Sequence, residues 1–415
     1  MRPNWKRVLQ IVAVVLITAL LASALTITIM NKSRGDRVVL TTAQYEVYRQ
    51  IDPLLELFEM AENTHYSEHE ISREQLMYGA MQGALSALDD PYARYYSEEE
   101  YVAYLEQLNG AYHGIGALIG QPVDGGVPVL KVYAGSPGEQ AGLVAGDIIL
   151  SVDGNTFSGL TLEEIEQLFV GEDGTVAAVR ILRAEEEQTL SITRGKGTIA
   201  QVDYRLFNQY TGYIRIDKFS GTAHEEVKEG LQDLIDRGMR SLVIDIRNNP
   251  GGELEQVVAI ADLLLPRANI VTVSNADGTE KVYTSDAKGV SVPIAVLVNG
   301  NSASASEVLA AAIQENDHGI VVGTSTYGKG VVQTTARLES NGGWVKMTTA
   351  VYYTPLGNNV NNKGVQPDIV IDLADELKGL PIDQIDQEDD AQLWAALDEI
   401  RAQADALNDA AGGAS

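Results

Sequence analysis

Three serines alternate with alanines in the stretch from Ser302 to Ser306, where an apolar segment gives way to a helical pattern. Residues 294–298 have the composition of a buried strand, and residues 305–315 are expected to form a helix. A hydroxyl at such a corner shares its space with the free N–H groups of the first helical turn. These donors can stabilise negative charge that develops on an attacked carbonyl. The corner is therefore a suitable place for a nucleophile.

The same corner also has a purely structural interpretation. Ser304 and Glu307 fit the S-x-x-E capping box, so Ser304 could serve only to cap its helix. Lys329, framed by glycines, and Gln333 shift the balance toward chemistry. In an extended strand, positions 329, 331 and 333 share one face. A neutral lysine can act as general base for a serine, with the glutamine holding the amine, and no histidine is then needed.

The stretches SASASE and YGKGVVQ together resemble the carboxy-terminal processing peptidases, the tail-specific serine proteases of family S41. The resemblance implies that Ser304 is the nucleophile, Lys329 its base and Gln333 the partner that orients the base. It places the oxyanion donors at main-chain amides: that of Ala305 and that of Gly251 or Gly252 in RNNPGG. Since no catalytic position is replaced, we expect an active serine-type endopeptidase that cleaves proteins near their C termini.

Length, charge and cysteine content narrow the class of protein. A chain of 415 residues predicts two or three domains. The formal net charge of −28 argues against nucleic-acid binding, which needs a basic patch. The absence of cysteine excludes disulfides, zinc–thiolate sites and a cysteine nucleophile. His65 and His69 have helical spacing without a supporting carboxylate cluster, so we expect neither a metal site nor a cofactor.

The N-terminal region has the features of a membrane segment. Residues 8–30 carry no charged side chain and are long enough to span a bilayer as a helix. Basic residues flank the segment equally on both sides, so the positive-inside rule does not decide its orientation. Ala22-Ser-Ala24 resembles a cleavage site, which makes a signal peptide the alternative. We expect a single anchor with the catalytic part outside the cytoplasm, or a secreted protein if the segment is cleaved.

Residues 41–108 show helical patterns, with Ser72 as a plausible cap. The phrase LDDPYARYYSEEEY resembles the family element that precedes the PDZ domain. The apolar faces of these helices have two interpretations, packing into the core of this chain or formation of a homodimer. An apolar stripe does not name its own partner, so both remain open.

The region from about residue 111 to 195 resembles a PDZ domain. The spacing in GIGALIG is not that of a dinucleotide-binding loop. The resemblance instead places the carboxylate-binding loop at Gly114, Ile115, Gly116 and Ala117. Loop amides can hold a terminal carboxylate while an exposed strand edge pairs with extended peptide. We therefore expect protein or peptide substrates bound through their C-terminal tails, with a structural or gating PDZ domain as the alternative.

Together these patterns predict a multi-domain α/β protein in five parts. The expected parts are a basic flank with a membrane anchor or signal (1–37), a helical region (38–110), a β-rich α+β PDZ domain (111–195), an S41 peptidase core (196–372) and an acidic helical C-terminal segment (373–415). The resemblance implies a crotonase/ClpP-like α/β peptidase core. The alternative function is that of a membrane-anchored PDZ adaptor with a silent peptidase unit.

Overall fold

A computed structural model of the chain describes most of its residues. The described ranges are 5–34, 40–66, 71–108, 110–120, 122, 125–133, 135–160, 162–208, 210–286, 288–378 and 380–412. The basic residues Arg2 and Arg37, His69 and the last three residues of the acidic segment lie outside these ranges. The chain forms two compact units, residues 1–81 and 82–415, which are taken separately below.

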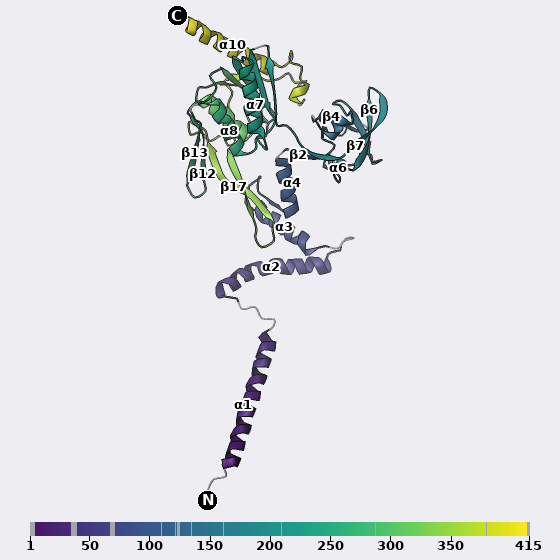
Figure 1. The fold of residues 1–415 in the computed structure, drawn as a ribbon, viewed down its shortest axis with the longest axis vertical. Coiled ribbons are helices and arrows are strands. Elements are labelled where there is room, and N and C mark those ends of the chain that lie inside the picture. The colour runs from purple at the N-terminus through teal and green to yellow at the C-terminus, as the bar shows by residue number, and fades with distance from the viewer. Residues whose placement is uncertain are drawn as a thin grey trace. The chain divides into compact units, whose positions relative to one another are not determined.

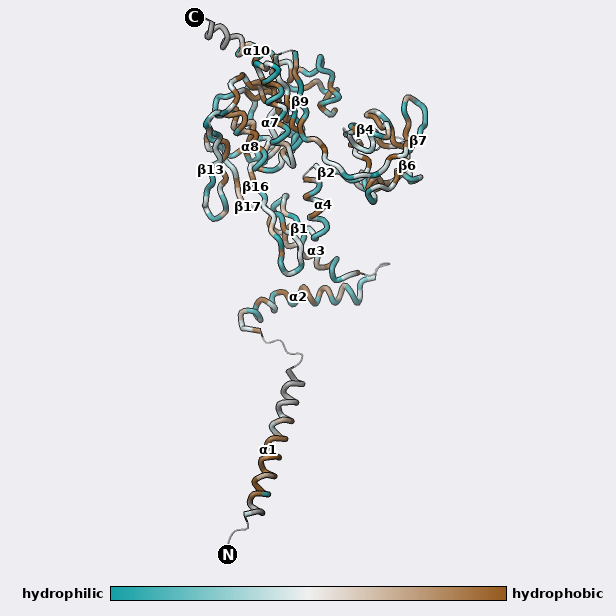
Figure 2. The backbone as a smooth tube through the Cα atoms, viewed as in Figure 1, coloured by the Kyte–Doolittle hydropathy of each residue, from teal (hydrophilic) through white to brown (hydrophobic). Residues whose placement is uncertain are grey.

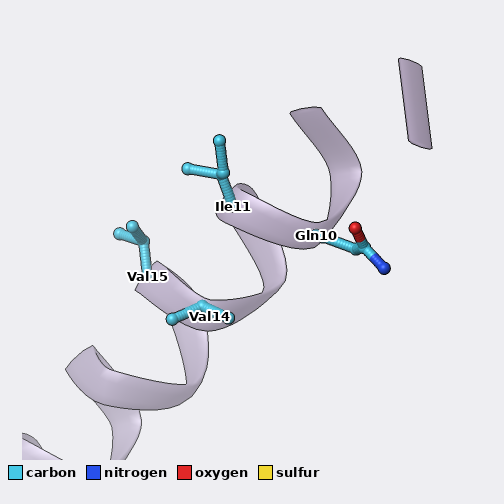
Figure 3. A pocket seen from close by; sticks show the side chains of 4 residues that line it. All are labelled: Gln10, Ile11, Val14 and Val15. Carbon is cyan, nitrogen blue, oxygen red and sulfur yellow. The ribbon is translucent and has the colours of Figure 1, made fainter. Parts of the chain in front are cut away.

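The first unit begins with helix α1, Trp5–Arg34. Its stretch Leu9–Thr26 has a mean hydropathy of 2.3 and no buried residues, so by length and composition α1 can cross a membrane. The apolar character of this helix is evident in Figure 2. Figure 3 shows a shallow hollow whose lining residues all belong to α1: Gln10, Ile11, Val14 and Val15. The hollow is lined by one exposed helix alone, and we assign it no ligand.

Helix α2, Thr42–Thr64, follows, and α3, Arg73–Ser86, runs into the second unit. The Ser72 hydroxyl accepts the Gln75 amide at 3.2 Å, so the predicted cap of α3 is confirmed. Helix α2 leaves several large apolar side chains exposed: Tyr45, Val47, Tyr48, Ile51, Leu57 and Met60. The homodimer stays a prediction, because nothing among the described residues shows what covers them.

The second unit contains a six-stranded sheet in the order β18-β15-β14-β11-β10-β9. The strands are β9 (Val202–Phe207), β10 (Thr211–Ile216), β11 (Ser241–Asp245), β14 (Ile294–Val298), β15 (Ile320–Gly323) and β18 (Ile369–Val370). All neighbours pair in parallel except β9, which is antiparallel to β10. The carboxyl ends of β11 and β14 therefore lie side by side, and the NNPGG loop and the serine corner follow from these two ends.

Helices cover both faces of this sheet, which explains why β14 and the middle of β11 are apolar. One face packs against α7 (Ala223–Asp236), α8 (Leu254–Leu264) and α9 (Ala305–Glu315). The other face packs against α10 (Ala391–Gly412). Side chains alternate along each strand, so Ile244 faces the three helices and Val243 faces α10. Figure 1 labels α7, α8 and α10 in this unit, and Figure 2 shows its hydrophobic residues in brown.

A buried ion network fastens the C-terminal segment to the end of β11. The Arg247 guanidinium bonds Asp245 at 2.5 Å and Asp390 at 2.8 Å, and it also donates to Gln392 at 3.1 Å. All four residues are almost fully buried. Asp390 Oδ1 in addition accepts the Leu393 amide at 3.0 Å, which starts α10. The helix therefore begins at residue 391, well inside the segment 373–415 that the sequence predicts to be helical.

A second, antiparallel sheet joins distant parts of the chain. It contains β12 (Asn269–Asn275), β13 (Glu280–Thr284), β16 (Val331–Arg337), β17 (Trp344–Tyr353) and a short strand β1 (Arg94–Tyr96). Strand β1 pairs with β17, with Tyr95 opposite Val345. The prediction that residues 41–108 are helical is wrong here, because a partner far along the chain draws this aromatic stretch into a sheet. Helix α4, Glu98–Leu108, follows directly.

The PDZ region is a five-stranded antiparallel sheet in the order β3-β4-β5-β6-β7. The strands are β3 (Ala117–Ile119), β4 (Val127–Val132), β5 (Ile148–Val152), β6 (Val176–Arg183) and β7 (Glu186–Thr193). Helices α5 (Pro137–Gln140) and α6 (Leu162–Phe169) complete it. Strand β2 (Ala111–Gly114) pairs with β8 (Gly195–Thr198), so the chain enters and leaves this region through one two-stranded ribbon. Strand β3 lies at the edge of the sheet.

Candidate active site

Ser304 occupies the turn from β14 into α9, and its backbone is strained. Its φ is 56° and its ψ is −113°, a conformation that costs a residue with a side chain about 1–3 kcal/mol. Ser302 is fully buried and donates to the Ile246 carbonyl at 2.8 Å. Ser306 is equally buried and donates to the Asn249 carbonyl at 2.8 Å. Ser302 and Ser306 thus attach the corner to the residues at the end of β11 and in the loop after it, while Ser304 between them adopts the unfavourable backbone conformation.

The glycine loop lies directly against Ser304. A Cβ atom added to Gly251 would stand 2.9 Å from Ser304 Cβ and 3.0 Å from the Ala305 nitrogen. Only glycine permits this approach at the positive φ of 103°. A Cβ on Gly252 would instead meet the Phe219 carbonyl oxygen at 2.1 Å. Both glycines are therefore needed, the first for the approach to the serine and the second for the contact with Phe219.

The main-chain donors at this corner differ in availability. The Gly251 amide donates to Asn249 Oδ1 at 2.8 Å. Within the described part of the chain, no hydrogen bond uses the amides of Gly252 or Ala305. Ala305 is the first residue of α9, where amides have no partner in the helix. The loop and the helix start thus each leave one main-chain donor open, at Gly252 and at Ala305.

A single buried carboxylate joins the main chains of Ser304 and Lys329. Glu307 Oε2 accepts the amides of both residues, each at 2.8 Å. Its other oxygen accepts the Gly328 amide at 2.8 Å and the Thr326 hydroxyl at 2.6 Å. Glu307 has no exposed surface. The capping-box residue that the sequence assigns to the helix therefore also holds the lysine loop against the serine corner.

The hydroxyl of Tyr352 makes a second bridge between the same two residues. It lies 2.5 Å from the Lys329 carbonyl oxygen and 3.1 Å from the Ser304 carbonyl oxygen. Burial, followed by the nearby Glu307 charge and Tyr92, raises the pKa of Tyr352 well above its ordinary value. The phenol therefore keeps its proton and acts as a donor. Glu307 thus binds the amides of Ser304 and Lys329, and Tyr352 lies at hydrogen-bond distance from the carbonyls of the same two residues. Both contacts hold the two backbone segments together.

Replacing Glu307 with glutamine tests the carboxylate bridge. Glutamine offers one acceptor oxygen for four donors, and its amide group faces N–H groups that it cannot accept. Each buried donor left without a partner costs about 1–3 kcal/mol, so we expect Glu307→Gln to lower the melting temperature markedly and to impair cleavage. Thermal unfolding checks this, with Glu229→Gln on the exposed side of α7 as the matched control. Unchanged stability and activity would contradict the bridge.

The Lys329 side chain lies half-buried in an environment that lowers its pKa. Burial is the main cause, and the positive charge of Lys346 adds to it, while Glu307 and Asp90 act in the opposite direction. A lysine with a lowered pKa provides more of the neutral amine that a general base requires. Its Nζ atom lies 4.5 Å from the centroid of the Tyr92 ring.

Gln333 does not contact the Lys329 amine among the described residues. Its Nε2 donates to Thr348 Oγ1 on β17 at 3.2 Å. Strand β16 begins only at Val331, so the alternation expected for positions 329, 331 and 333 does not extend back to the lysine. The register between β16 and β17 also shifts between Val332 and Gln333. The orienting role predicted for Gln333 therefore has no direct contact in this structure.

The four residues predicted to bind a peptide tail lie together in the PDZ region. Gly114 ends β2 with a φ of 115°, and a Cβ there would stand 2.5 Å from the Phe169 carbonyl oxygen at the end of α6. Ile115 is buried, Gly116 has a φ of 70°, and Ala117 opens the edge strand β3. The loop thus runs from β2 past the end of α6 into β3 at the edge of the sheet, and peptide addition to a sheet requires such an edge.

Sequence motifs alone do not identify three contributors to the site: Tyr352, Asp90 and Tyr92. Tyr352 is one aromatic residue among several in a strand, and nothing in its spacing indicates a bridge. Asp90 and Tyr92 belong to LDDPYARYY, which marks a family element without naming a contact. Asp90 accepts the Thr348 amide at 2.8 Å and thereby joins this segment to β17. The roles of Asp90 and Tyr92 depend on contacts with Thr348 and Lys329, more than 200 positions further along the chain.

Comparisons with known proteins agree with this arrangement. The profile of peptidase family S41 matches residues 210–371, and a PDZ-domain profile matches residues 129–183. A CtpA-like serine protease of Staphylococcus haemolyticus is 33% identical over 372 residues, which cover 89% of this chain and 73% of that protein. The carboxy-terminal processing protease CtpA of Bacillus subtilis is 32% identical over 378 residues, which cover 90% and 79%.

A solved structure shares the fold. A Bacteroides fragilis protein assigned to the S41 proteases superimposes with a TM-score of 0.55 at 16% identity, over 83% of this chain and 96% of the other. At this identity the likeness shows the mixed α/β fold alone, while the sequence relatives carry the assignment of family. The chain belongs to the C-terminal processing serine proteases of peptidase family S41 and contains a PDZ domain.

Proposed function

We propose that this protein is a membrane-anchored serine endopeptidase that cleaves polypeptides near their C termini with Ser304 as nucleophile and Lys329 as general base. The observation that carries the proposal is the shared hydrogen bonding of the two main chains through Glu307 Oε2. A strained nucleophile at a strand-to-helix corner is a recurring arrangement in hydrolases of α/β fold. The catalytic part would be built on a crotonase/ClpP-like core that spans about residues 196–372.

The reaction would proceed by acyl transfer. The neutral Lys329 amine takes the proton of the Ser304 hydroxyl as Oγ bonds to the peptide carbonyl carbon. The carbonyl oxygen gains negative charge and is met by the amide of Ala305 and by a glycine amide, for which Gly252 is the open donor in the loop. The lysine ammonium then protonates the leaving amine as the peptide bond breaks. Water, deprotonated by the same lysine, releases the acyl group from Ser304 and restores the free hydroxyl.

The PDZ region would select the substrate. The loop Gly114–Ala117 would receive the terminal carboxylate, and the substrate would add as a strand to the edge of β3. Helix α1 would hold the protein in the membrane with residues after it outside the cytoplasm. A cleaved signal is the alternative fate of α1, and N-terminal sequencing of the mature protein separates the two.

The proposal is tested with the detergent-solubilised full chain and reporter proteins that differ only in their C-terminal residues. We expect mass spectrometry to find cleavage near the C terminus of reporters with a free, apolar tail, and less cleavage when the terminal carboxylate is amidated. Ser304→Ala serves as the control for a contaminating protease. If the wild-type chain binds the tails but releases no fragment at any pH, the alternative of a PDZ adaptor with a silent peptidase unit holds instead.

A further inference from the structure

The amine of Lys329 meets an aromatic ring in this structure. Nζ lies 4.5 Å from the centroid of the Tyr92 ring. Within the described residues, no hydrogen bond joins Nζ to the Ser304 hydroxyl. The face of an aromatic ring attracts an ammonium ion through its quadrupole, whereas a neutral amine gains little from the same contact. The contact therefore favours the form of Lys329 that cannot accept a proton.

Tyr92 is firmly attached to the strand that carries Tyr352. Asp90 accepts the Tyr92 amide at 3.0 Å and the Thr348 amide at 2.8 Å. The Thr348 hydroxyl also donates a hydrogen bond to the Asp90 carboxylate, at 3.2 Å. Two residues after Tyr92 the chain enters β1, which pairs with β17. The ring is thus placed by the segment before the PDZ region, from outside the peptidase motifs.

Charged groups from three elements face the Lys329 amine. Glu307 on α9 and Asp90 before β1 favour the ammonium form, while Lys346 on β17 and the burial of the site oppose it. Lys346 is itself engaged by aromatic rings, at 4.8 Å from Tyr104. Burial and Lys346 prevail, so the pKa of Lys329 is lowered. A cation–π contact with the Tyr92 ring would act against this lowering, because it favours the ammonium form.

We propose that Tyr92 is a positioning residue for Lys329. The Tyr92 ring holds the protonated Lys329 amine in the resting enzyme and releases it when the amine turns toward Ser304. The proposal rests on the proposed function, because it assumes that Lys329 is the base. The main chains of the two residues are already joined, so the change from resting to reactive geometry needs rotation of the lysine side chain. Tyr92 would set both the starting point of that rotation and the pH at which it begins.

The first measurement is the pH profile of kcat/KM for the full chain. Cleavage rises with pH as the base loses its proton, so the midpoint of the acidic limb reports the pKa of the base. Because the ring stabilises the ammonium, Tyr92→Leu should move this midpoint to lower pH by about half a unit. Tyr92→Phe keeps the ring and should move it little. A ring that only fills space would change the rate at all pH values alike.

The second measurement reads the lysine directly. The full chain with Ser304→Ala and lysine labelled with ¹³C at Cε is titrated by NMR, and the Lys329 signal is assigned by its loss in Lys329→Arg. Tyr92→Leu should lower the observed pKa by the same half unit. The matched control is Tyr283→Leu, which removes the ring of a similar pair on β13, where Lys281 Nζ lies 4.2 Å from the Tyr283 ring. This control should leave Lys329 unchanged.

The two measurements separate the possible failures. If Tyr92→Leu leaves the Lys329 titration in place, or if Tyr92→Phe shifts it as far, the ring does not hold the amine and the proposal is overturned. If the titration shifts but the acidic limb does not, Lys329 is not the base and the proposed function fails instead. Should the leucine variant not fold, fluorinated phenylalanines at position 92 keep the shape while weakening the ring face. Their titrations should then move in steps with fluorine content.

Discussion

Lys329→Ala is expected to reduce kcat/KM for peptide cleavage by about 10,000-fold or more, with Ser304→Ala at least as severe. The proposed mechanism gives the serine hydroxyl no other base among the described residues, since the Glu307 carboxylate already accepts four hydrogen bonds. The two losses should not add in the double variant, because the residues act in one step. Steady-state cleavage of a tailed reporter by the purified chain measures the effect.

The flanking serines are the matched controls for this result. Ser302 and Ser306 are buried, and each donates a hydrogen bond, to the carbonyl of Ile246 or of Asn249, that is lost on substitution by alanine. We therefore expect both alanine variants to lose stability, by about 1–3 kcal/mol each, while retaining turnover below their melting temperatures. If either control proves inactive although folded, or if folded Lys329→Ala retains its turnover, the roles assigned to Ser304 and Lys329 are refuted.

The Arg247→Met variant should be destabilised by about 3–5 kcal/mol. The substitution leaves Asp245 and Asp390 buried without their counter-charge. Although burial alone would raise the pKa of Asp245, the Arg247 charge and its hydrogen bonds lower it. A carboxylate with a lowered pKa in the folded state stabilises the protein above its unfolded pKa and loses that contribution as pH falls. The variant should therefore unfold at a higher pH than the wild type on acidification.

An exposed ion pair provides the comparison. Arg237 and Asp233 lie one turn apart on the surface of α7 at 2.9 Å, and Arg237→Met should cost no more than about 0.5 kcal/mol. Acid titrations followed by tryptophan fluorescence compare the two variants. A shift for Arg247→Met as small as that for Arg237→Met would mean that the buried network contributes nothing to stability. Because Arg247 directly precedes Asn248–Gly252, we also expect the loss of activity to follow the loss of stability.

The strand-to-helix corner could be predicted from the sequence almost to the residue. Residues 294–298 and 305–315 form β14 and α9 as the periodicity predicts, because burial on both faces and local capping leave clear local patterns. The neighbouring parallel strand β11 and the helices α7 and α8 are likewise predicted from their local apolar patterns. The family assignment from SASASE and YGKGVVQ is confirmed by the relatives.

Contacts made across the fold could not be predicted in this way. The position of Lys329 was inferred from strand alternation, but the strand starts two residues later and the lysine is held by Glu307 and Tyr352. The stretch Arg94–Tyr96 lies within the region 38–110 that is expected to be helical, and its pairing with β17 depends on residues about 250 positions away. Local sequence patterns do not indicate which distant residue a segment contacts. The family motifs indicate that a segment belongs to the site, but they do not name its contact partner.

The double bridge by Glu307 and Tyr352 restricts how this protease could be switched on and off. An activator cannot pull the serine and lysine backbones apart without exposing a carboxylate and a phenol whose partners lie in both segments. Such a rupture would amount to local unfolding. We therefore expect control of this enzyme to act through smaller events: rotation of the Lys329 side chain, or access of the polypeptide substrate to a site whose two main-chain segments are already held together.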